Sequence, residues 1–219
     1  MMKGDDIHVF LRLVRKSIKQ WPVPVVGRLA ERGCDPFKIL IACILSLRTR
    51  DQTTAEASER LFAISSDPYS ISKMALKKIE KAIFPVGFFR TKAKQIQAIS
   101  QKICEDFNGK TPDNIEDLLS LPGVGRKTAN LVVTVGHKKP GICVDIHVHR
   151  ICNRWGYVAT KTPDKTEQIL REKLPKKFWI PLNGLLVAFG QNVCTPISPW
   201  CSSCQLTQIC AKVAVSSSR

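Results

Sequence analysis

The sequence predicts an all-α fold of roughly ten short helices. Three observations lead to this prediction. Proline follows a capping residue at several points, apolar residues recur at three- and four-residue spacing, and no sustained apolar–polar alternation appears between hairpin turns. The sequence also has no internal repeat, low-complexity linker or heptad run, which favours a globular array of helices.

The helix signals follow one another along the chain. Cap-and-proline pairs predict three helix starts, at Asp35-Pro36, Thr111-Pro112 and Thr162-Pro163. Residues 93–107 have apolar residues on one helical face, and the opposite edge carries Lys92, Lys94 and Lys102. Residues 131–135 have strand-forming side chains, but they follow a helix-opening turn, so we expect the buried half of a helix there.

The charge balance indicates a polyanionic partner. The chain has 34 Lys and Arg against 18 Asp and Glu, a formal net charge of +16. Nucleic acid is the commonest such partner, and a merely soluble basic protein or one bound to acidic membranes are the alternatives. No apolar stretch approaches the roughly 20 residues of a membrane span. The N-terminus, residues 1–6, is typical of neither a signal nor a transit peptide, so we expect an intracellular protein.

The nine cysteines divide into one compact group and five scattered residues. The group follows the pattern C-x6-C-x2-C-x5-C and consists of Cys194, Cys201, Cys204 and Cys210. Four thiolates this close in sequence can bind one metal centre. Zinc remains an alternative, although zinc sites usually have two short C-x2-4-C pairs. The scattered thiols indicate a reducing compartment and no disulfide framework: Cys34, Cys43, Cys104, Cys143 and Cys152.

The segment LPGVGRKTAN, residues 121–130, places Lys127 on the first turn of a helix. Its two glycines permit a tight turn with positive φ and leave backbone N–H groups accessible. The helix start adds unpaired N–H groups and the positive end of the helix dipole, so a phosphate can bind there. For a lone Gly-x-Gly, an ordinary loop is the alternative. A carboxylate follows 18 positions later, Asp145 in the run VDIHVHR of residues 144–150.

The hairpin, the aspartate and the cysteine pattern, in this order, resemble the endonuclease III branch of the helix-hairpin-helix DNA glycosylases. The resemblance covers about Asp35 to Cys210. It implies a two-lobed fold, with a six-helix domain at residues 29–139 and a discontinuous domain of residues 1–28 and 140–219. The second domain would hold a [4Fe–4S] cluster on the four grouped cysteines. A DNA-associated monomer is implied, which removes oxidised pyrimidines from double-stranded DNA and cuts abasic sites by β-elimination.

The resemblance also assigns the chemistry. Lys127 would form a Schiff base with the sugar, and Asp145 would stabilise positive charge on the sugar and move a proton. Attack requires the neutral amine, which Arg126, the helix N-terminus and partial burial favour. Taken singly, Lys127 could simply neutralise a phosphate, and Asp145 could be a helix cap.

Two further loops resemble those that open the duplex in this family. Arg48, where many relatives have glutamine, would fill the hole left by the flipped nucleotide, and Phe88 would act as a wedge between bases. Phe89 is expected in the core. The other predicted DNA contacts are Gly123, Val124, Gly125, Arg126, His147 and Arg150. Residues 195–200 lack the Lys or Arg that relatives often carry, so phosphate contact by that loop does not carry over.

Three other functions fit the sequence less well. A mismatch-specific or adenine-removing glycosylase of the same fold is disfavoured, because those branches commonly lack a lysine at the position of Lys127. A non-catalytic helix-hairpin-helix DNA-binding protein would give no purpose to Lys127 and Asp145 together. An electron-transfer protein would explain a cluster but not the net charge of +16.

Overall fold

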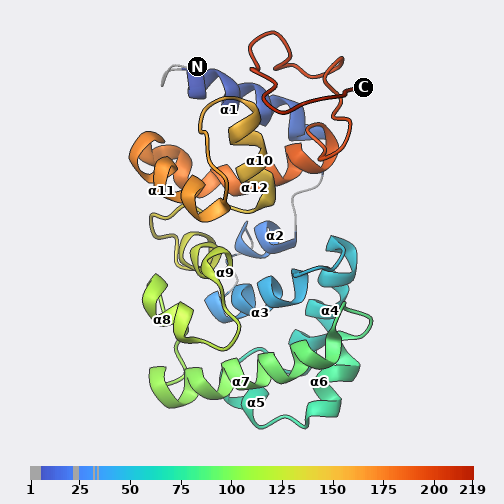
Figure 1. Cartoon of the computed structure of the whole chain (residues 1–219). Helices are drawn as coiled ribbons and strands as arrows, with labels where there is room; N and C mark the ends of the chain where they lie inside the picture. The colour runs from blue at the N-terminus through green and yellow to red at the C-terminus, as the bar shows by residue number, and fades with distance from the viewer. Residues whose placement is uncertain (1–5, 22–24, 32, 34) are drawn as a thin grey trace. The chain divides into compact units, whose positions relative to one another are not determined.

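The structure, a computed structural model, describes residues 6–21, 25–31, 33 and 35–219. These residues form helices joined by turns and loops, with no strand among them (Figure 1). The all-α prediction is therefore confirmed. Residues 1–5, on which the expectation about the N-terminus depends, and Cys34 lie outside the described residues. No helix in the described parts is long and apolar enough to cross a membrane.

Internal contacts divide the chain into two compact units. We call Pro24–Lys139 the hairpin unit, and Met1–Val23 together with Pro140–Arg219 the cysteine unit. The first boundary expected from the sequence, after residue 28, falls inside helix α2 (Val25–Glu31), and the contacts assign this whole helix to the hairpin unit. That the two units are separate functional domains stays a prediction.

The hairpin unit is built around α3 (Pro36–Ser46), in which every residue from Ile39 to Leu45 is buried. This helix packs against α2, α4, α7, α9 and η2. The long helix α7 runs beside α5 and α6 (Figure 1). The remaining bounds are α4 Asp51–Ile64, α5 Pro68–Ser72, α6 Leu76–Ile83, α7 Phe89–Phe107, α8 Ile115–Ser120, α9 Arg126–Leu131 and η2 Val132–Gly136.

The cysteine unit has a core of large aromatic and aliphatic side chains. The rings of Phe10 and Trp155 lie 4.8 Å apart between centroids, and both are buried. Its helices are α1 Asp6–Ser17, η1 Ile18–Gln20, α10 Ile146–Arg154, α11 Pro163–Lys173, η3 Lys176–Phe178 and α12 Trp179–Asn192. After α12 the chain has no further helix, and this irregular segment, residues 193–219, contains all four grouped cysteines.

Two of the three predicted helix starts are confirmed. Asp35 caps α3 by accepting a hydrogen bond from Phe37 N at 2.8 Å, and Thr162 caps α11. The start predicted at Thr111-Pro112 is wrong, because α8 begins three residues later at Ile115. There Asn114 Oδ1 accepts from Asp117 N at 2.9 Å, and this side-chain cap fixes the helix start.

Residues 131–135 are helical and largely buried, as predicted, although the helix widens. After α9 the chain makes a π-helical turn, η2, in which His137 N donates to Val132 O at 3.0 Å. The β-branched side chains of this run fill the hairpin unit's core, so burial overrides their strand propensity.

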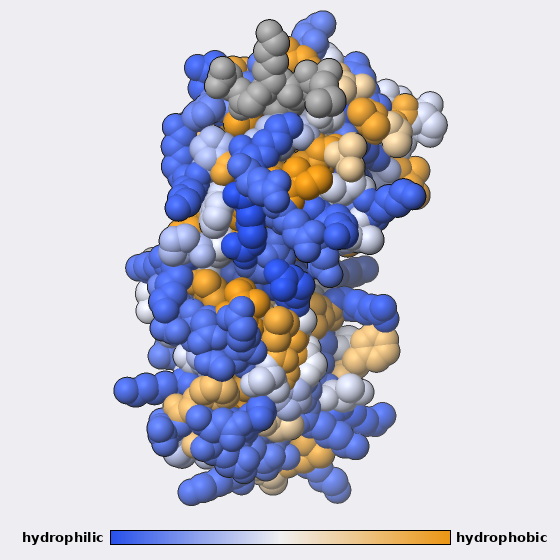
Figure 2. All heavy atoms as spheres, turned by 60° about the vertical axis from the view of Figure 1, so that its left-hand side comes forward, coloured by the Kyte–Doolittle hydropathy of each residue, from blue (hydrophilic) through white to orange (hydrophobic). Residues whose placement is uncertain are grey.

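The molecular surface contrasts with this apolar core. The face seen in Figure 2 is mainly hydrophilic, with separate apolar patches.

Candidate functional site

The turn between α8 and α9 is anchored in the core of the hairpin unit. Leu121 and Val124 are 2% and 6% exposed and belong to that core. Gly123 has φ +66°, a conformation that favours glycine, and an added Cβ would lie 2.5 Å from Gln95 Nε2. The same Gln95 nitrogen donates to Pro122 O at 3.1 Å and so ties the turn to α7. Gly125 has φ −95° and open space around it, so only accessibility of its backbone favours glycine there.

This turn presents Arg126 and Lys127 at the start of α9, and both side chains are exposed. The partial burial expected for Lys127 is therefore wrong: the buried residues of this helix are Thr128, Ala129 and Asn130. Behind the helix lies the thiol of Cys43. Burial raises the pKa of Cys43 to about 12, and the positive charge of Lys127 opposes that rise. The lysine ammonium is thus near the core of the hairpin unit while remaining open to solvent.

Asp145 caps helix α10 in the cysteine unit. Its Oδ1 accepts from His147 N at 2.9 Å and from Val148 N at 3.0 Å, and the residue is only 6% exposed. These hydrogen bonds confirm the alternative interpretation, in which Asp145 is a helix cap. It is compatible with catalysis, because two backbone bonds to one oxygen fix the orientation of the carboxylate. The neighbouring Ile146 is 66% exposed.

Two predicted DNA contacts on α10, His147 and Arg150, make contacts inside the cysteine unit. The Arg150 guanidinium donates to Cys194 O at 2.9 Å and to Gly190 O at 3.1 Å, and it lies 3.1 Å from His147 Nδ1. Burial lowers the pKa of Arg150 from its ordinary value, although an arginine stays protonated. Their contact with DNA stays a prediction, since these bonds already use part of the guanidinium.

Arg154, one helical turn further along α10, was missed by the sequence reasoning. It is 8% exposed and donates to Thr195 O at 2.6 Å and to Pro196 O at 2.7 Å. Its guanidinium also lies 3.4 Å from Cys194 Sγ. The sequence signal was its spacing of four residues from Arg150, which puts both side chains on one face of the helix. Together the two arginines tie residues 194–196 to α10.

The four grouped cysteines line a single cavity, together with Arg154, Trp155 and Phe189. Burial raises the pKa of Cys204 and of Cys210, and the charges of the other grouped cysteines add to the rise. Four thiols therefore face one another closely enough to interact. Among the described residues, however, no group of three or more His, Cys, Asp or Glu side chains has the spacing to hold a single metal ion.

The two loops expected to open a duplex lie side by side. Arg48 and Phe88 are both exposed, and both adopt the left-handed conformation, with φ 52° and φ 58°. Such values are uncommon for residues other than glycine. The Arg48 guanidinium carbon lies 5.9 Å from the centroid of the Phe88 ring. Phe89 packs against the core, as predicted.

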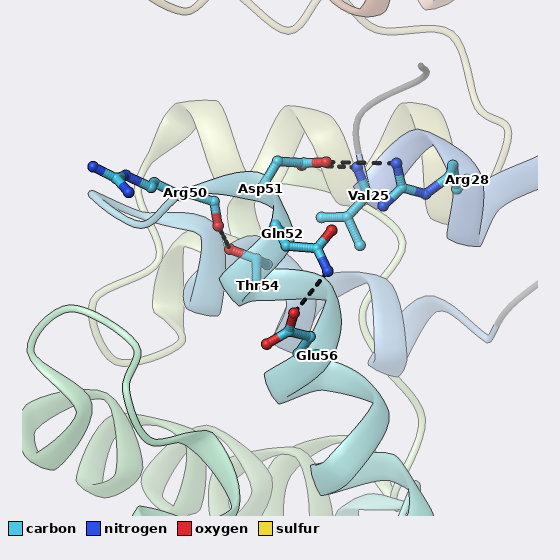
Figure 3. Close-up of polar contacts among 7 residues, drawn as sticks. All are labelled: Val25, Arg28, Arg50, Asp51, Gln52, Thr54 and Glu56. Atoms are coloured by element: carbon cyan, nitrogen blue, oxygen red, sulfur yellow. Dashed lines mark hydrogen bonds and ion pairs between the residues drawn. The ribbon is translucent and has the colours of Figure 1, made fainter.

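The loop that carries Arg48 is anchored where it enters α4 (Figure 3). Asp51 accepts a hydrogen bond from Val25 N at 2.9 Å and lies 3.6 Å from the Arg28 guanidinium, so α2 holds this end of the loop. Arg50 O accepts from the Thr54 hydroxyl at 3.1 Å and starts the helix. The backbone of Arg48 thus lies between two fixed helix ends.

Comparisons with known proteins agree with this geometry. Residues 41–176 match the family described as HhH-GPD superfamily base excision DNA repair protein. The chain is 43% identical over 198 residues to Endonuclease III of Thermotoga maritima, covering 90% of each. It is 40% identical over 206 residues to Endonuclease III-like protein 1 of Bos taurus, covering 89% of this chain and 67% of that relative.

Solved structures give the same picture. The chain is similar, with a TM-score of 0.85, to a protein whose structure is described as a non-covalent Endonuclease III-DNA complex. A trapped Endonuclease III-DNA covalent intermediate gives a TM-score of 0.83. Each is 31% identical in sequence, and the match covers 97% of both chains.

Proposed function

The chain belongs to the endonuclease III branch of the HhH-GPD superfamily of base excision DNA repair proteins, and on that premise we propose that Lys127 and Asp145 carry its chemistry. It is a base excision repair DNA glycosylase, and AP lyase activity is typical of the family. Its proposed substrates are oxidised pyrimidines and abasic sites in double-stranded DNA, on which it would act as a monomer.

The proposed reaction begins at the sugar. The neutral amine of Lys127 attacks C1′, the bond from C1′ to the base breaks, and the base leaves with a proton. Asp145 stabilises the positive charge that develops on the sugar and carries protons. Ring opening gives a Schiff base between Lys127 and C1′. Loss of a proton from C2′ then expels the 3′ phosphate, and water releases the lysine from the sugar fragment.

The hairpin turn supports a role in holding the DNA backbone. Backbone N–H groups near Gly123 and Gly125, with the start of α9, offer donors to a phosphate, and Arg126 adds a positive charge. Because the turn is anchored through Leu121 and Val124, a bound phosphate would fix the strand relative to Lys127. The net charge of +16 supplies attraction that does not depend on base sequence.

The four grouped cysteines would hold a [4Fe–4S] cluster. They line one cavity, and their sequence pattern has only one short C-x2-C pair where zinc sites usually have two, which favours the cluster over zinc. The cluster would supply no bond-making step to the reaction. It would cross-link residues 193–219, which form no helix of their own.

The observation that carries the proposal is the exposed Lys127 on a core-anchored hairpin, in a chain 43% identical to an endonuclease III. Borohydride reduces a Schiff base to a permanent bond. Wild-type protein should therefore cross-link to DNA containing thymine glycol or an abasic site. Lys127→Gln should abolish the cross-link while DNA affinity stays near normal, because phosphate contacts dominate binding.

Lys110→Gln is the matched control, because it removes an exposed lysine from the loop before α8. It should cross-link as wild type does. If Lys127→Gln still cross-links and nicks abasic DNA at the wild-type rate, another amine is the nucleophile and the assignment is wrong.

A further inference from the structure

Lys92, on the first turn of α7, is buried although the sequence placed it on the polar edge of that helix. It is 5% exposed. Lysines are almost never buried without partners, because removing an ammonium from water is costly. Burial lowers the pKa of Lys92 to about 8. The position of this side chain therefore calls for a physical reason.

The Lys92 ammonium donates to the loop that carries Arg48. Its Nζ lies 2.8 Å from Leu45 O, 2.5 Å from Leu47 O and 3.1 Å from Thr49 Oγ1. An ammonium has three N–H donors, so these three oxygens match its full capacity. The acceptors lie on both sides of Arg48 in the sequence. The two carbonyls, Leu45 O and Leu47 O, also lie at the C-terminal end of α3, where carbonyl groups lack helical partners and a positive charge is favourable.

The same residue contacts the loop that carries Phe88. Its backbone N donates to Phe88 O at 3.0 Å, which is the first helical bond of α7 and does not depend on the lysine side chain. Thr49 Oγ1, which accepts from Lys92 Nζ, also accepts from Gly87 N at 3.3 Å. A Cβ on Gly87 would lie 2.8 Å from Arg48 O, so the two loops approach closely through a glycine. The Lys92 ammonium therefore reaches the second loop through Thr49 Oγ1, the hydroxyl oxygen that it shares with Gly87 N.

We propose that Lys92 is a positioning residue, which holds the loops of Arg48 and Phe88 together so that both exposed side chains enter the duplex as one unit. This inference rests on the proposed function. Both tips have unfavourable left-handed φ values, and such conformations persist only where surrounding contacts determine them. The Asp51 anchor fixes one end of the Arg48 loop (Figure 3), whereas Lys92 fixes its middle and joins it to the second loop.

Lys92→Met tests the proposal, because methionine keeps the length of the side chain and removes its donors. Excision of thymine glycol from duplex DNA should fall about tenfold or more, whereas cleavage of single-stranded abasic DNA should stay within about twofold of wild type. Lys94→Met is the matched control: it removes an exposed lysine two residues along α7 and should leave both rates unchanged.

A double-mutant cycle separates positioning from general stability. In a protein that already carries Arg48→Ala and Phe88→Ala, adding Lys92→Met should cost less than about twofold in duplex excision, because the side chains that it positions are gone. If Lys92→Met lowers the excision rate in that background by the same factor as in wild type, Lys92 does not act through the side chains of Arg48 and Phe88.

Thr49→Val carries the test if Lys92→Met fails to fold, since it removes one acceptor and keeps the lysine. It should give a smaller loss, again confined to duplex DNA. For either variant, equal losses on duplex and single-stranded substrates would overturn the proposal and leave Lys92 as a cap of α3.

A binding measurement that needs no cleavage of DNA keeps the test of Lys92 distinct from the test of the proposed function. In the Lys127→Gln protein, 2-aminopurine placed opposite an abasic-site analogue should brighten on binding as it is displaced, and adding Lys92→Met should remove most of that signal. If wild type cleaves neither substrate, the proposed function fails, and the fluorescence still decides the role of Lys92. An unchanged signal would overturn that role.

Discussion

The α8–α9 hairpin and the irregular segment of residues 193–219 are both predicted to serve DNA repair, but they are held in opposite ways. Buried apolar side chains anchor the hairpin, through Leu121 and Val124. The segment places Leu206 in the core of the cysteine unit and otherwise depends on polar ties from Arg150 and Arg154 to backbone carbonyls and on four cysteines around one cavity. The difference is that ordinary core packing preorganises the hairpin, whereas the proposed cluster would complete the segment.

The largest expected effect comes from removing the proposed cluster. Pure protein should be yellow-brown with about four irons per chain, as a [4Fe–4S] cluster requires. Cys204→Ala should lose the colour and leave the amides of residues 193–219 unprotected in hydrogen exchange, while residues 121–130 keep their protection. Cys104→Ala, a free thiol outside the group, should keep both.

Stoichiometric zinc without colour would contradict the cluster. Equal loss of protection in residues 193–219 and residues 121–130 would contradict the contrast between them, because the hairpin would then also depend on the cluster.

The second effect is local to the hairpin and smaller. Gly123→Ala should lower the free energy of unfolding by about 1 to 2 kcal/mol, because its φ of +66° is unfavourable for alanine. Gly125→Ala should leave stability unchanged, since its φ is ordinary and its surroundings are open. Urea denaturation of the two variants measures the contrast, and the iron content should stay at the wild-type level in both.

Equal stability loss in the two glycine variants would contradict this account of the turn. Loss of iron from Gly123→Ala would show that the hairpin and the cysteine segment are coupled, contrary to the contrast between them.

Much of the fold and the motifs could be predicted from the sequence, because their signals are local. The pairs Asp35-Pro36 and Thr162-Pro163 each indicate a helix start from two adjacent residues. The hairpin and the cysteine spacing are likewise contiguous patterns in the sequence. The start at Thr111-Pro112 failed because Asn114 competes as a cap at a distance of only three residues. A local pattern can suggest several caps, and tertiary packing selects among them.

The remaining features depend on contacts between segments far apart in the chain. Lys92 looks like one more surface lysine until the end of α3 is placed beside it. Arg154 likewise gains its role only when residues 195 and 196 return to α10. The exposure of Lys127 also depends on which face of α9 packs against the core, and the sequence of the hairpin alone does not determine that face.

The last effect concerns pH and acts on the hairpin unit alone. The pKa of Lys92 is about 8 in the folded protein because of burial, whereas an unfolded lysine titrates near 10.4. Below pH 8 the lysine is protonated in both states, so the cost of burying its charge is fully present. Between about pH 8 and pH 10 the unfolded state binds more protons, so this contribution makes the protein more stable as pH rises.

The expected gain is at most about 3 kcal/mol over that window, and the three oxygen acceptors of Lys92 reduce it because they favour the charged amine. Urea midpoints of wild type and Lys92→Met, compared at pH 7 and pH 9.5, measure it as a change in their difference. Lys94→Met should show no such change. A stability difference between wild type and Lys92→Met that is independent of pH would mean that Lys92 keeps its proton throughout, held by those three oxygens. A permanently charged Lys92 would then hold the loops of Arg48 and Phe88 together, and excision from duplex DNA would not weaken through this lysine in mild alkali.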